Sequence, residues 1–162
     1  EGLCWAYRRT YGVPTIVVNC SNMFGSRQSL KAYIPKVIRA AKRNELIKVH
    51  VNQGNPGHRY YLHASNLAKW VVAQLKKPDL SEFKSHLSGE RHISNIEVVN
   101  LVGKIMGVQP RVTMVEASGV RPGYDSSYAM SSWSEWTPVT RFEKGLADTI
   151  SWAEASPEWW LV

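Results

Sequence analysis

The sequence predicts an α/β fold that forms a single unit over residues 1–162. Some stretches are β-branched or alternate apolar with polar residues, as strands do, and amphipathic stretches with the period of a helix lie between them. This succession of strands and helices is typical of α/β proteins. Residues 13–18 are mostly β-branched and carry no charge, which indicates a strand covered on both faces, as in a parallel sheet. The sequence has no internal repeat, low-complexity segment or linker, so one compact core is expected.

The first half of the chain is expected to alternate helices with extended segments. Apolar residues at helical spacing predict the helices, and alternation of apolar with polar residues predicts the half-exposed strand. The expected elements are a helix that ends at Gly12, a strand that begins at Val13, a polar loop over residues 19–25, a helix over 33–41, a strand over 46–51 and a turn over 53–57.

The second half is expected to contain three helices, two of which open with a capping box, in which Ser or Thr is followed three residues later by Glu. The expected elements are an extended segment over 59–63, a helix capped by Ser65 and ended by Pro78, a strand over 83–87, a helix from Ser94 closed by Gly107, a strand over 111–116, a polar loop over 118–125 and a helix from Thr140. The residues assigned to inner helix faces are Leu67, Ala68, Val71, Val72 and Leu75, then Phe142, Leu146 and Ile150.

The net charge of +7 favours anionic partners such as nucleic acid, a membrane surface or phosphate-bearing small molecules. The basic residues alternate with apolar helix positions where they are densest, at Lys31, Lys36, Arg39, Lys42, Arg43 and Lys48. This pattern indicates a solvated helix face, and a nucleic-acid-binding module is kept as the weaker alternative. No apolar run reaches the length of a membrane span, and a membrane is not expected as a partner.

The two cysteines, Cys4 and Cys20, are too few for a disulfide framework. We expect both to be small buried side chains in a reducing compartment, which makes the cytoplasm the expected location. The histidines lack the spacing of a zinc site, so no metal is expected. The sequence contains no glycine-rich phosphate loop, P-loop or Gly-x-Ser-x-Gly elbow, and no catalytic residue is predicted within it.

Four residues at the boundaries of strands or helices are suited to binding an anion: Asn22, Arg59, Asn95 and Arg121. The planar fork of an arginine fits phosphate oxygens, and two such residues can clamp a diphosphate. Asn95 is expected just inside a helix start, where free amides and the helix dipole favour anions. On these residues alone two alternatives stay open, namely arginines in ordinary surface ion pairs and an ordinary turn after the first strand.

The order of several short motifs adds a resemblance. They are Tyr11-Gly-Val-Pro, Asn19-Cys-Ser-Asn-Met-Phe-Gly25, Tyr33-Ile-Pro35, Arg59-Tyr-Tyr-Leu-His-Ala-Ser-Asn66, Ser94-Asn-Ile-Glu-Val-Val99 and Arg121-Pro-Gly-Tyr-Asp125. Their succession from Leu3 to Trp160 resembles the C-terminal half of extended short-chain dehydrogenases of the NAD-dependent epimerase/dehydratase family, especially the dTDP-glucose 4,6-dehydratases. The resemblance implies a partial Rossmann-like sheet with a small C-terminal substrate-binding lobe.

The resemblance also implies a role for each matching residue. Asn22 matches the asparagine of the Asn-x-Tyr-Gly loop, which contacts the substrate, and Arg59 and Arg121 match arginines that grip the substrate diphosphate. Asn95 matches a nucleotide-contacting asparagine, and Tyr124 stands at a substrate position where the family usually has His. The expected substrate is therefore a dTDP- or UDP-linked sugar.

The resemblance places Cys20 and Ser21 on the cofactor side of the same loop. Members of the family bind NAD through a glycine-rich half and use a Tyr-x-x-x-Lys pair, and neither motif occurs in this sequence. We therefore expect NAD to be bound mainly by an N-terminal half absent from this chain and supplied by another chain or a homo-oligomer, with no activity from this chain alone. Met23, Tyr124 and Ser131 depart from the family pattern, so a non-catalytic binding or assembly protein that retains the fold is the alternative.

Overall fold

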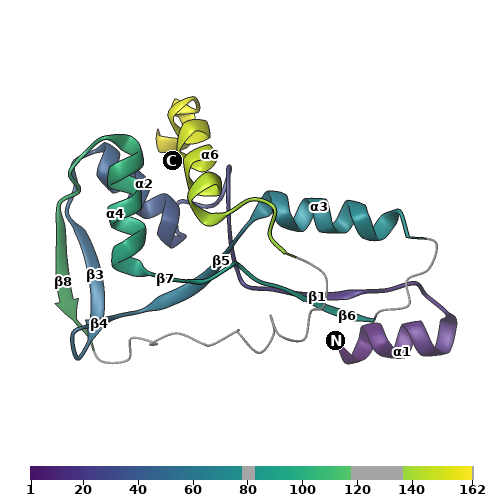
Figure 1. The fold of residues 1–162 in the computed structure, drawn as a ribbon. Helices are drawn as coiled ribbons and strands as arrows, with labels where there is room; N and C mark the ends of the chain where they lie inside the picture. The colour runs from purple at the N-terminus through teal and green to yellow at the C-terminus, as the bar shows by residue number, and fades with distance from the viewer. Residues whose placement is uncertain (78–82, 118–136, 162) are drawn as a thin grey trace.

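The computed structural model describes residues 1–77, 83–117 and 137–161 (Figure 1). These residues form three small sheets with strand orders β1-β6, β2-β5-β7 and β4-β3-β8. The β1-β6 pair lies between helices α3 and α1, whereas α2, α4 and α6 gather at the opposite end of the molecule beside β3 and β8 (Figure 1). The predicted α/β class is confirmed.

The N-terminal part consists of α1 (Gly2–Tyr11), β1 (Val17–Cys20), β6 (Lys84–Leu87) and α3 (Ala64–Leu75). Gly12 ends α1 in the left-handed conformation, with φ of 65°, and its N–H donates to the carbonyl of Arg8 at 3.1 Å. β1 runs parallel to β6. The strand starts four residues later than expected, because Pro14 has no N–H to pair and the Arg8 guanidinium already binds the carbonyl of Thr15.

Burial in this part is lower than the sequence predicts. β1 is half-buried where a strand covered on both faces was expected, and α1 has no buried residue. Cys4 and Cys20, expected to be buried, are both exposed. The physical reason is that β1 pairs only with β6 among the described residues, and a sheet of two strands is too narrow to cover the helices on its two faces.

The central sheet consists of β2 (Asn22–Phe24), β5 (His58–His63) and β7 (His92–Ser94). β2 is parallel to β5 and β7 is antiparallel to it. The prediction of a polar loop over residues 19–25 is therefore wrong for most of that range. Asn19 and Cys20 still belong to β1, and after Ser21 the chain pairs again at once, because β5 offers an edge for β2.

The third sheet consists of β3 (Ile47–Asn52), β4 (Asn55–Pro56) and β8 (Val112–Glu116). β3 alternates buried and exposed residues as predicted, and β8 lies parallel to it. The turn between β3 and β4 places Gln53 and Gly54 at φ values of 51° and 76°. Consecutive positive φ values are typical of a tight hairpin turn.

Three further helices and a short 3₁₀ helix complete the described part of the fold: α2 (Tyr33–Lys42), α4 (Asn95–Met106), α6 (Phe142–Glu154) and η1 (Pro157–Leu161). Their buried faces join β3 and the central sheet in the main core, whose fully buried members include Ile34, Ile38, Val98, Val102 and Leu146. A second cluster of Leu62, Trp70 and Leu87 lies under α3. No helix among the described residues is long and apolar enough to cross a membrane.

Of the two predicted capping boxes, the one at Ser94 forms its serine half, whereas Glu97 Oε1 accepts a hydrogen bond from Arg91. Ser94 Oγ accepts from the Glu97 N–H at 3.2 Å, and Gly107 ends α4 at φ 65°. The cap by Thr140 is wrong, because its hydroxyl lies 3.0 Å from the Ser65 hydroxyl and α6 has no side-chain cap.

The cap by Ser65 is wrong as well, because the imidazole of His63 caps α3. The inner face of α3 also differs from the prediction. Its buried residues are Asn66 and Trp70, while Val71, Val72 and Leu75 are exposed.

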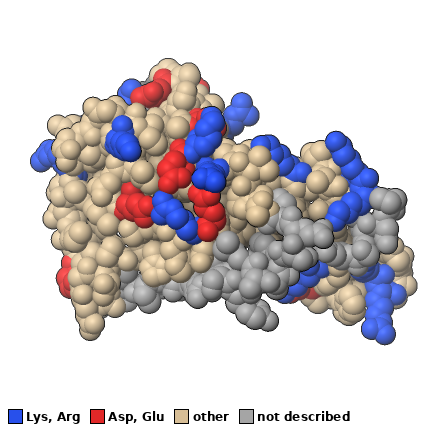
Figure 2. Space-filling view, viewed as in Figure 1, with Lys and Arg blue, Asp and Glu red and all other residues tan. Residues whose placement is uncertain are grey.

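A network of ion pairs joins the N-terminal ends of α4 and α6. The guanidinium of Arg91 lies 2.7 Å from Glu97 Oε1 and 2.8 Å from Glu143 Oε1. Figure 2 shows acidic and basic side chains interleaved over this face. Arg91 therefore ties the two helices together on a face of mixed charge.

Candidate functional site

The central sheet brings three of the predicted ligand residues together. Asn22 on β2 is the partner of Tyr61 on β5, and Arg59 lies two residues earlier on the same strand. The N–H of Asn95, at the start of α4, donates to the carbonyl of Gly57 at 2.8 Å, two residues before Arg59. Asn22, Arg59 and Asn95 therefore come from three adjoining segments, with Arg59 in the middle.

Arg59 is half-buried, and its Nη1 donates to the carbonyl of His58 at 2.6 Å. This bond to the main chain orients the guanidinium beside β5. A guanidinium offers five N–H donors in a fixed plane and accepts none, so it is chemically matched to phosphate or carboxylate oxygens. Asn22 is exposed and Asn95 is half-buried, so both side chains are within reach of solvent.

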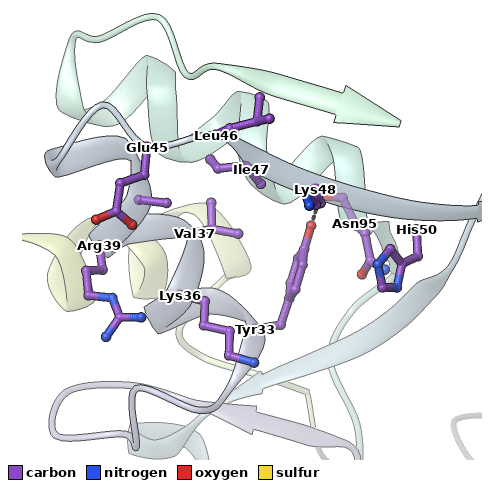
Figure 3. A pocket seen from close by; sticks show the side chains of 11 residues that line it. Tyr33, Lys36, Val37, Arg39, Glu45, Leu46, Ile47, Lys48, His50 and Asn95 are labelled. Atoms are coloured by element: carbon purple, nitrogen blue, oxygen red, sulfur yellow. Dashed lines mark hydrogen bonds between the residues drawn. The ribbon is translucent and has the colours of Figure 1, made fainter. Parts of the chain in front are cut away.

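Asn95 also lines a pocket between α2 and β3, with a volume of about 410 Å³ (Figure 3). Tyr33, on the α2 wall, donates its phenolic proton to the main-chain carbonyl of Asn95 at 2.8 Å. Burial raises the pKa of Tyr33, and a smaller contribution from Tyr61 acts in the same direction. Tyr33 therefore stays a neutral donor that fixes the start of α4 against α2.

Of the eleven residues that line this pocket, three are lysine or arginine and one is histidine. Figure 3 shows Lys36 and Arg39 on the α2 wall and Lys48 and His50 on the β3 side. Glu45 is the one carboxylate among the lining residues, and it lies 3.8 Å from Arg43 Nη1. The pocket is therefore suited to a ligand that carries negative charge.

Sequence reasoning noted Lys36, Arg39 and Lys48 as basic residues of a solvated face and did not assign them to a pocket, although their pattern was readable. Lys48 and His50 alternate with the buried residues of β3, so they share its outer face. Lys36 follows Tyr33 by three residues on α2, and residues at that spacing are neighbours on a helix surface. What the pattern left open was that α2 lies against β3, which depends on tertiary packing.

The two residues expected on the cofactor side lie at the end of β1. The Ser21 N–H donates to the carbonyl of Leu87 at 2.8 Å, and Ser21 Oγ accepts from the Gly89 N–H at 3.2 Å. The Ser21 hydroxyl thus joins the ends of β1 and β6. Cys20 is exposed over much of its surface, and desolvation of the part of the thiol that is covered raises the pKa of Cys20.

Gly89, which the sequence reasoning did not single out, is required by close packing. A Cβ atom at this position would lie 2.1 Å from the carbonyl oxygen of Tyr61 and 2.8 Å from its carbonyl carbon. Only a glycine lets the segment after β6 approach β5 this closely. The segment after β6 is thereby held against β5 at Tyr61, two residues after Arg59.

Two predicted substrate residues, Arg121 and Tyr124, lie outside the described residues, as do Ser131 and the expected loop over 118–125. Within residues 1–77, 83–117 and 137–161, no group of three or more His, Cys, Asp or Glu side chains is arranged to hold a metal ion.

Comparison with known proteins gives the same family for sequence and structure. The model of the NAD dependent epimerase/dehydratase family matches residues 1–87. A dTDP-glucose 4,6-dehydratase from Escherichia coli is 30% identical, over 99% of this chain and 47% of its own length. A trifunctional UDP-glucose 4,6-dehydratase from Arabidopsis thaliana is also 30% identical, over 99% of this chain and 24% of its own length.

The crystal structure of dTDP-glucose 4,6-dehydratase from Bacillus anthracis in complex with NAD superimposes with a TM-score of 0.78 at 25% identity, covering 99% of this chain and 51% of that one. The chain thus spans about half the length of the single-function dehydratases that it matches. The family model covers more than half of the 162 residues, and the fold agrees along nearly the whole chain. The chain therefore belongs to the NAD-dependent epimerase/dehydratase family.

Proposed function

We propose that this chain binds the nucleotide sugar of an NAD-dependent dehydratase or epimerase. It acts together with an NAD-binding half that another chain or a homo-oligomer supplies. The observation that carries the proposal is the meeting of Asn22, Arg59 and Asn95 around β5. Three residues expected separately from the sequence come from segments far apart in the chain. The relatives act on dTDP-glucose or UDP-glucose, which supports a dTDP- or UDP-linked sugar as the ligand.

Each residue has a role that follows from its chemistry. The Arg59 guanidinium binds the diphosphate, because its fork of donors matches phosphate oxygens. The amide of Asn22 hydrogen-bonds the sugar, and Asn95, which lines the pocket, holds the nucleotide. Arg121 and Tyr124 are proposed to complete the substrate site.

NAD is proposed as the cofactor, and the residues of this chain fit part of its site. β1 and β6 are parallel and end at Cys20 and Leu87, and dinucleotides bind beyond the carboxyl ends of such strands. The exposed Cys20 side chain is small, and the Ser21 hydroxyl is fixed by Gly89. When bound, NAD would accept a hydride and later return it. Cys20 and Ser21 would line one side of its site.

The need for an NAD-binding half is supported by surfaces around β1 and β6. Leu3 and Tyr11 of α1 are 72% and 71% exposed, and Leu75 of α3 is 77% exposed. Among the described residues β1 and β6 pair only with each other, so each presents an open edge. Open strand edges and clustered apolar side chains are normally covered in folded proteins, and further parallel strands would cover both.

Isothermal titration of the chain with dTDP, UDP and their glucose conjugates tests the nucleotide-sugar part of the proposal. Arg59→Gln is expected to weaken binding about tenfold or more, because a charge-assisted bond to phosphate is lost. Arg43→Gln is the matched control, since Arg43 is an exposed arginine that lines no part of the site. Absence of binding by the intact chain, or equal losses in both variants, would contradict the proposal.

A non-catalytic binding or assembly role is the second candidate. It is favoured by the sequence, which contains no Tyr-x-x-x-Lys pair and has Met23 where the family usually has a second asparagine. Adding an NAD-binding half and measuring conversion of dTDP-glucose to its 4-keto-6-deoxy product separates the candidates. Turnover supports the dehydratase, whereas binding of nucleotide sugar without turnover supports the second candidate.

A further inference from the structure

Residues 25–32 connect β2, which carries Asn22, to α2, which begins at Tyr33. The segment contains no regular helix or strand. Arg27 adopts a left-handed conformation with φ of 65°, which is uncommon for a residue other than glycine. Such a conformation persists only where the surrounding contacts hold it. Contacts that fix residues 25–32 can also fix the end of β2, because the two are continuous.

The side chain of Gln28 closes this segment back onto β2. Its Nε2 donates to the carbonyl of Met23 at 2.8 Å, and the Gln28 N–H donates to the carbonyl of Gly25 at 3.3 Å. Met23 directly follows Asn22, so the side-chain bond is anchored beside the proposed sugar ligand. The other amide atom of Gln28, Oε1, is buried and has no hydrogen-bond partner among the described residues. An unpaired buried acceptor is unfavourable, so Gln28 contributes less to stability than its bond to Met23 alone would.

Trp159 on η1 holds the main chain of the same glutamine. Its indole Nε1 donates to the carbonyl of Gln28 at 3.2 Å, across 131 positions of the sequence. The Trp159 ring packs against Trp152 of α6, with the ring centroids 5.2 Å apart and the planes at 70°. Both tryptophans pack against the main core. The position of Gln28 therefore depends on the packing of α6 and η1.

The nucleotide end of the proposed site has supports of its own. Two bonds of 2.8 Å hold the main chain of Asn95, one from the Tyr33 hydroxyl to its carbonyl and one from its N–H to the carbonyl of Gly57. Neither bond involves Gln28 or Trp159. Loss of the contact between these two residues is therefore expected to disturb the sugar end of the site and to leave the nucleotide end in place.

We propose that Gln28 and Trp159 are positioning residues for the sugar part of the nucleotide-sugar site, an inference that rests on the proposed function. The Gln28 amide fixes the carbonyl of Met23, and with it the end of β2 from which Asn22 reaches the sugar. The Trp159 N–H keeps Gln28 where this bond can form. Neither residue touches the ligand, and α6 and η1 influence sugar binding through residues 25–32.

Calorimetric titration with dTDP and dTDP-glucose tests this, or with UDP and UDP-glucose where these bind more tightly, because the ratio of the two dissociation constants isolates the sugar. Trp159→Phe keeps an aromatic ring and removes the N–H, while Gln28→Met keeps the approximate size and removes both amide atoms. We expect each variant to weaken the nucleotide sugar about fivefold relative to the free nucleotide, since one hydrogen bond is lost. Trp152→Phe is the matched control from the same ring pair and should keep the ratio.

Urea denaturation of the same variants separates positioning from stability. Gln28→Met should keep nearly the same urea midpoint, because loss of the bond to Met23 is offset by removal of the unpaired Oε1. A changed ratio at an unchanged midpoint supports positioning, since a purely structural role would move both. If Gln28→Met does not fold, Trp159→Phe decides alone.

The remaining outcomes distinguish this inference from the proposed function. If both variants keep the ratio of the unaltered chain, the inference is wrong and the proposed function stands. It is also overturned if Trp152→Phe lowers the ratio as much as Trp159→Phe, or if the variants weaken nucleotide and nucleotide sugar equally. If the unaltered chain binds neither ligand, the proposed function fails first and this inference fails with it.

Discussion

Asn66 joins α3 to the segment that leads into α6, and its removal is expected to destabilise the fold. The side chain is 1% exposed and forms two hydrogen bonds to the backbone of Thr140, one from Nδ2 to the carbonyl and one from the Thr140 N–H to Oδ1, each 2.8 Å long. Asn66→Ala removes both partners. Asn66→Asp keeps the acceptor for the N–H but turns a carboxylate oxygen toward the Thr140 carbonyl.

The magnitude follows from the two groups left unpaired. A buried backbone donor or acceptor without a partner costs about 1–3 kcal/mol. Thr140 is only half-buried, so water relieves part of this cost. We expect Asn66→Ala to lower the free energy of unfolding by about 2–4 kcal/mol. Asn66→Asp is expected to lose at least as much, because a desolvated charge faces a carbonyl oxygen.

Urea denaturation followed by tryptophan fluorescence provides the measurement, because Trp70 lies one turn further along α3 and is itself buried. Asn100→Ala is the control, since Asn100 is exposed on α4, and its effect should stay within about 0.5 kcal/mol. A loss below about 1 kcal/mol for Asn66→Ala, or full stability of Asn66→Asp, would refute the reasoning that the two bonds hold the segment in place.

Three further changes test other parts of the fold. Gly89→Ala is expected to lower the free energy of unfolding by about 2–4 kcal/mol, because its Cβ would lie 2.1 Å from the Tyr61 carbonyl oxygen; an unchanged urea midpoint would contradict this. Burial lowers the pKa of His63, so the unfolded chain binds a proton more readily. Stability should be full above about pH 6.5 and fall as the pH drops from there toward the folded pKa. His63→Gln should flatten that decline in thermal unfolding. Arg91→Gln should cost at most about 1 kcal/mol and less in high salt, because the ion pairs of Arg91 are exposed, so a larger loss argues against this view.

Helices and strands whose buried faces lie within this chain were predictable from the sequence. The apolar spacing over residues 33–41 and the alternation over 46–51 predicted α2 and β3, because each packs against the main core. α6 buries the expected Phe142, Leu146 and Ile150 for the same reason. Gly12 and Gly107 ended helices as predicted, since the left-handed conformation strongly favours glycine.

Capping was less predictable, because one side chain can bind any of several partners. Ser94 caps α4, while the equivalent Thr140 bonds the Ser65 hydroxyl instead. His63 caps α3, with its Nδ1 3.3 Å from the Ser65 N–H. The local sequence could not reveal that choice, because it depends on the distant segment before α6 being held against α3.

The ligand roles of Asn22, Arg59 and Asn95 stay a prediction, whereas the walls of the pocket could not be predicted from the sequence. Asn22, Arg59 and Asn95 stand in recognisable motifs, and the central sheet brings them together. The pocket lined by Lys36 and Lys48 arises from the packing of α2 against β3, which no short motif describes. The basic pattern predicted a solvated helix face, and Lys36 and Lys42 are both exposed on α2, although Lys36 also borders the pocket.

The wrong burial predictions occur in one region, and that location carries information. Leu3 and Tyr11 on α1, Cys20 on β1 and Leu75 on α3 have the spacing or composition of buried residues, yet all are exposed. They lie on β1 itself or on α1 and α3, the helices on the two sides of the β1-β6 pair (Figure 1). These residues have the pattern of buried residues but are exposed in this fold. We therefore expect further strands beside β1 or β6 to cover them. Hydrogen exchange of β1 measured with and without an NAD-binding half tests this expectation, because added pairing must slow exchange along residues 17–20, and an unchanged rate would count against such a partner.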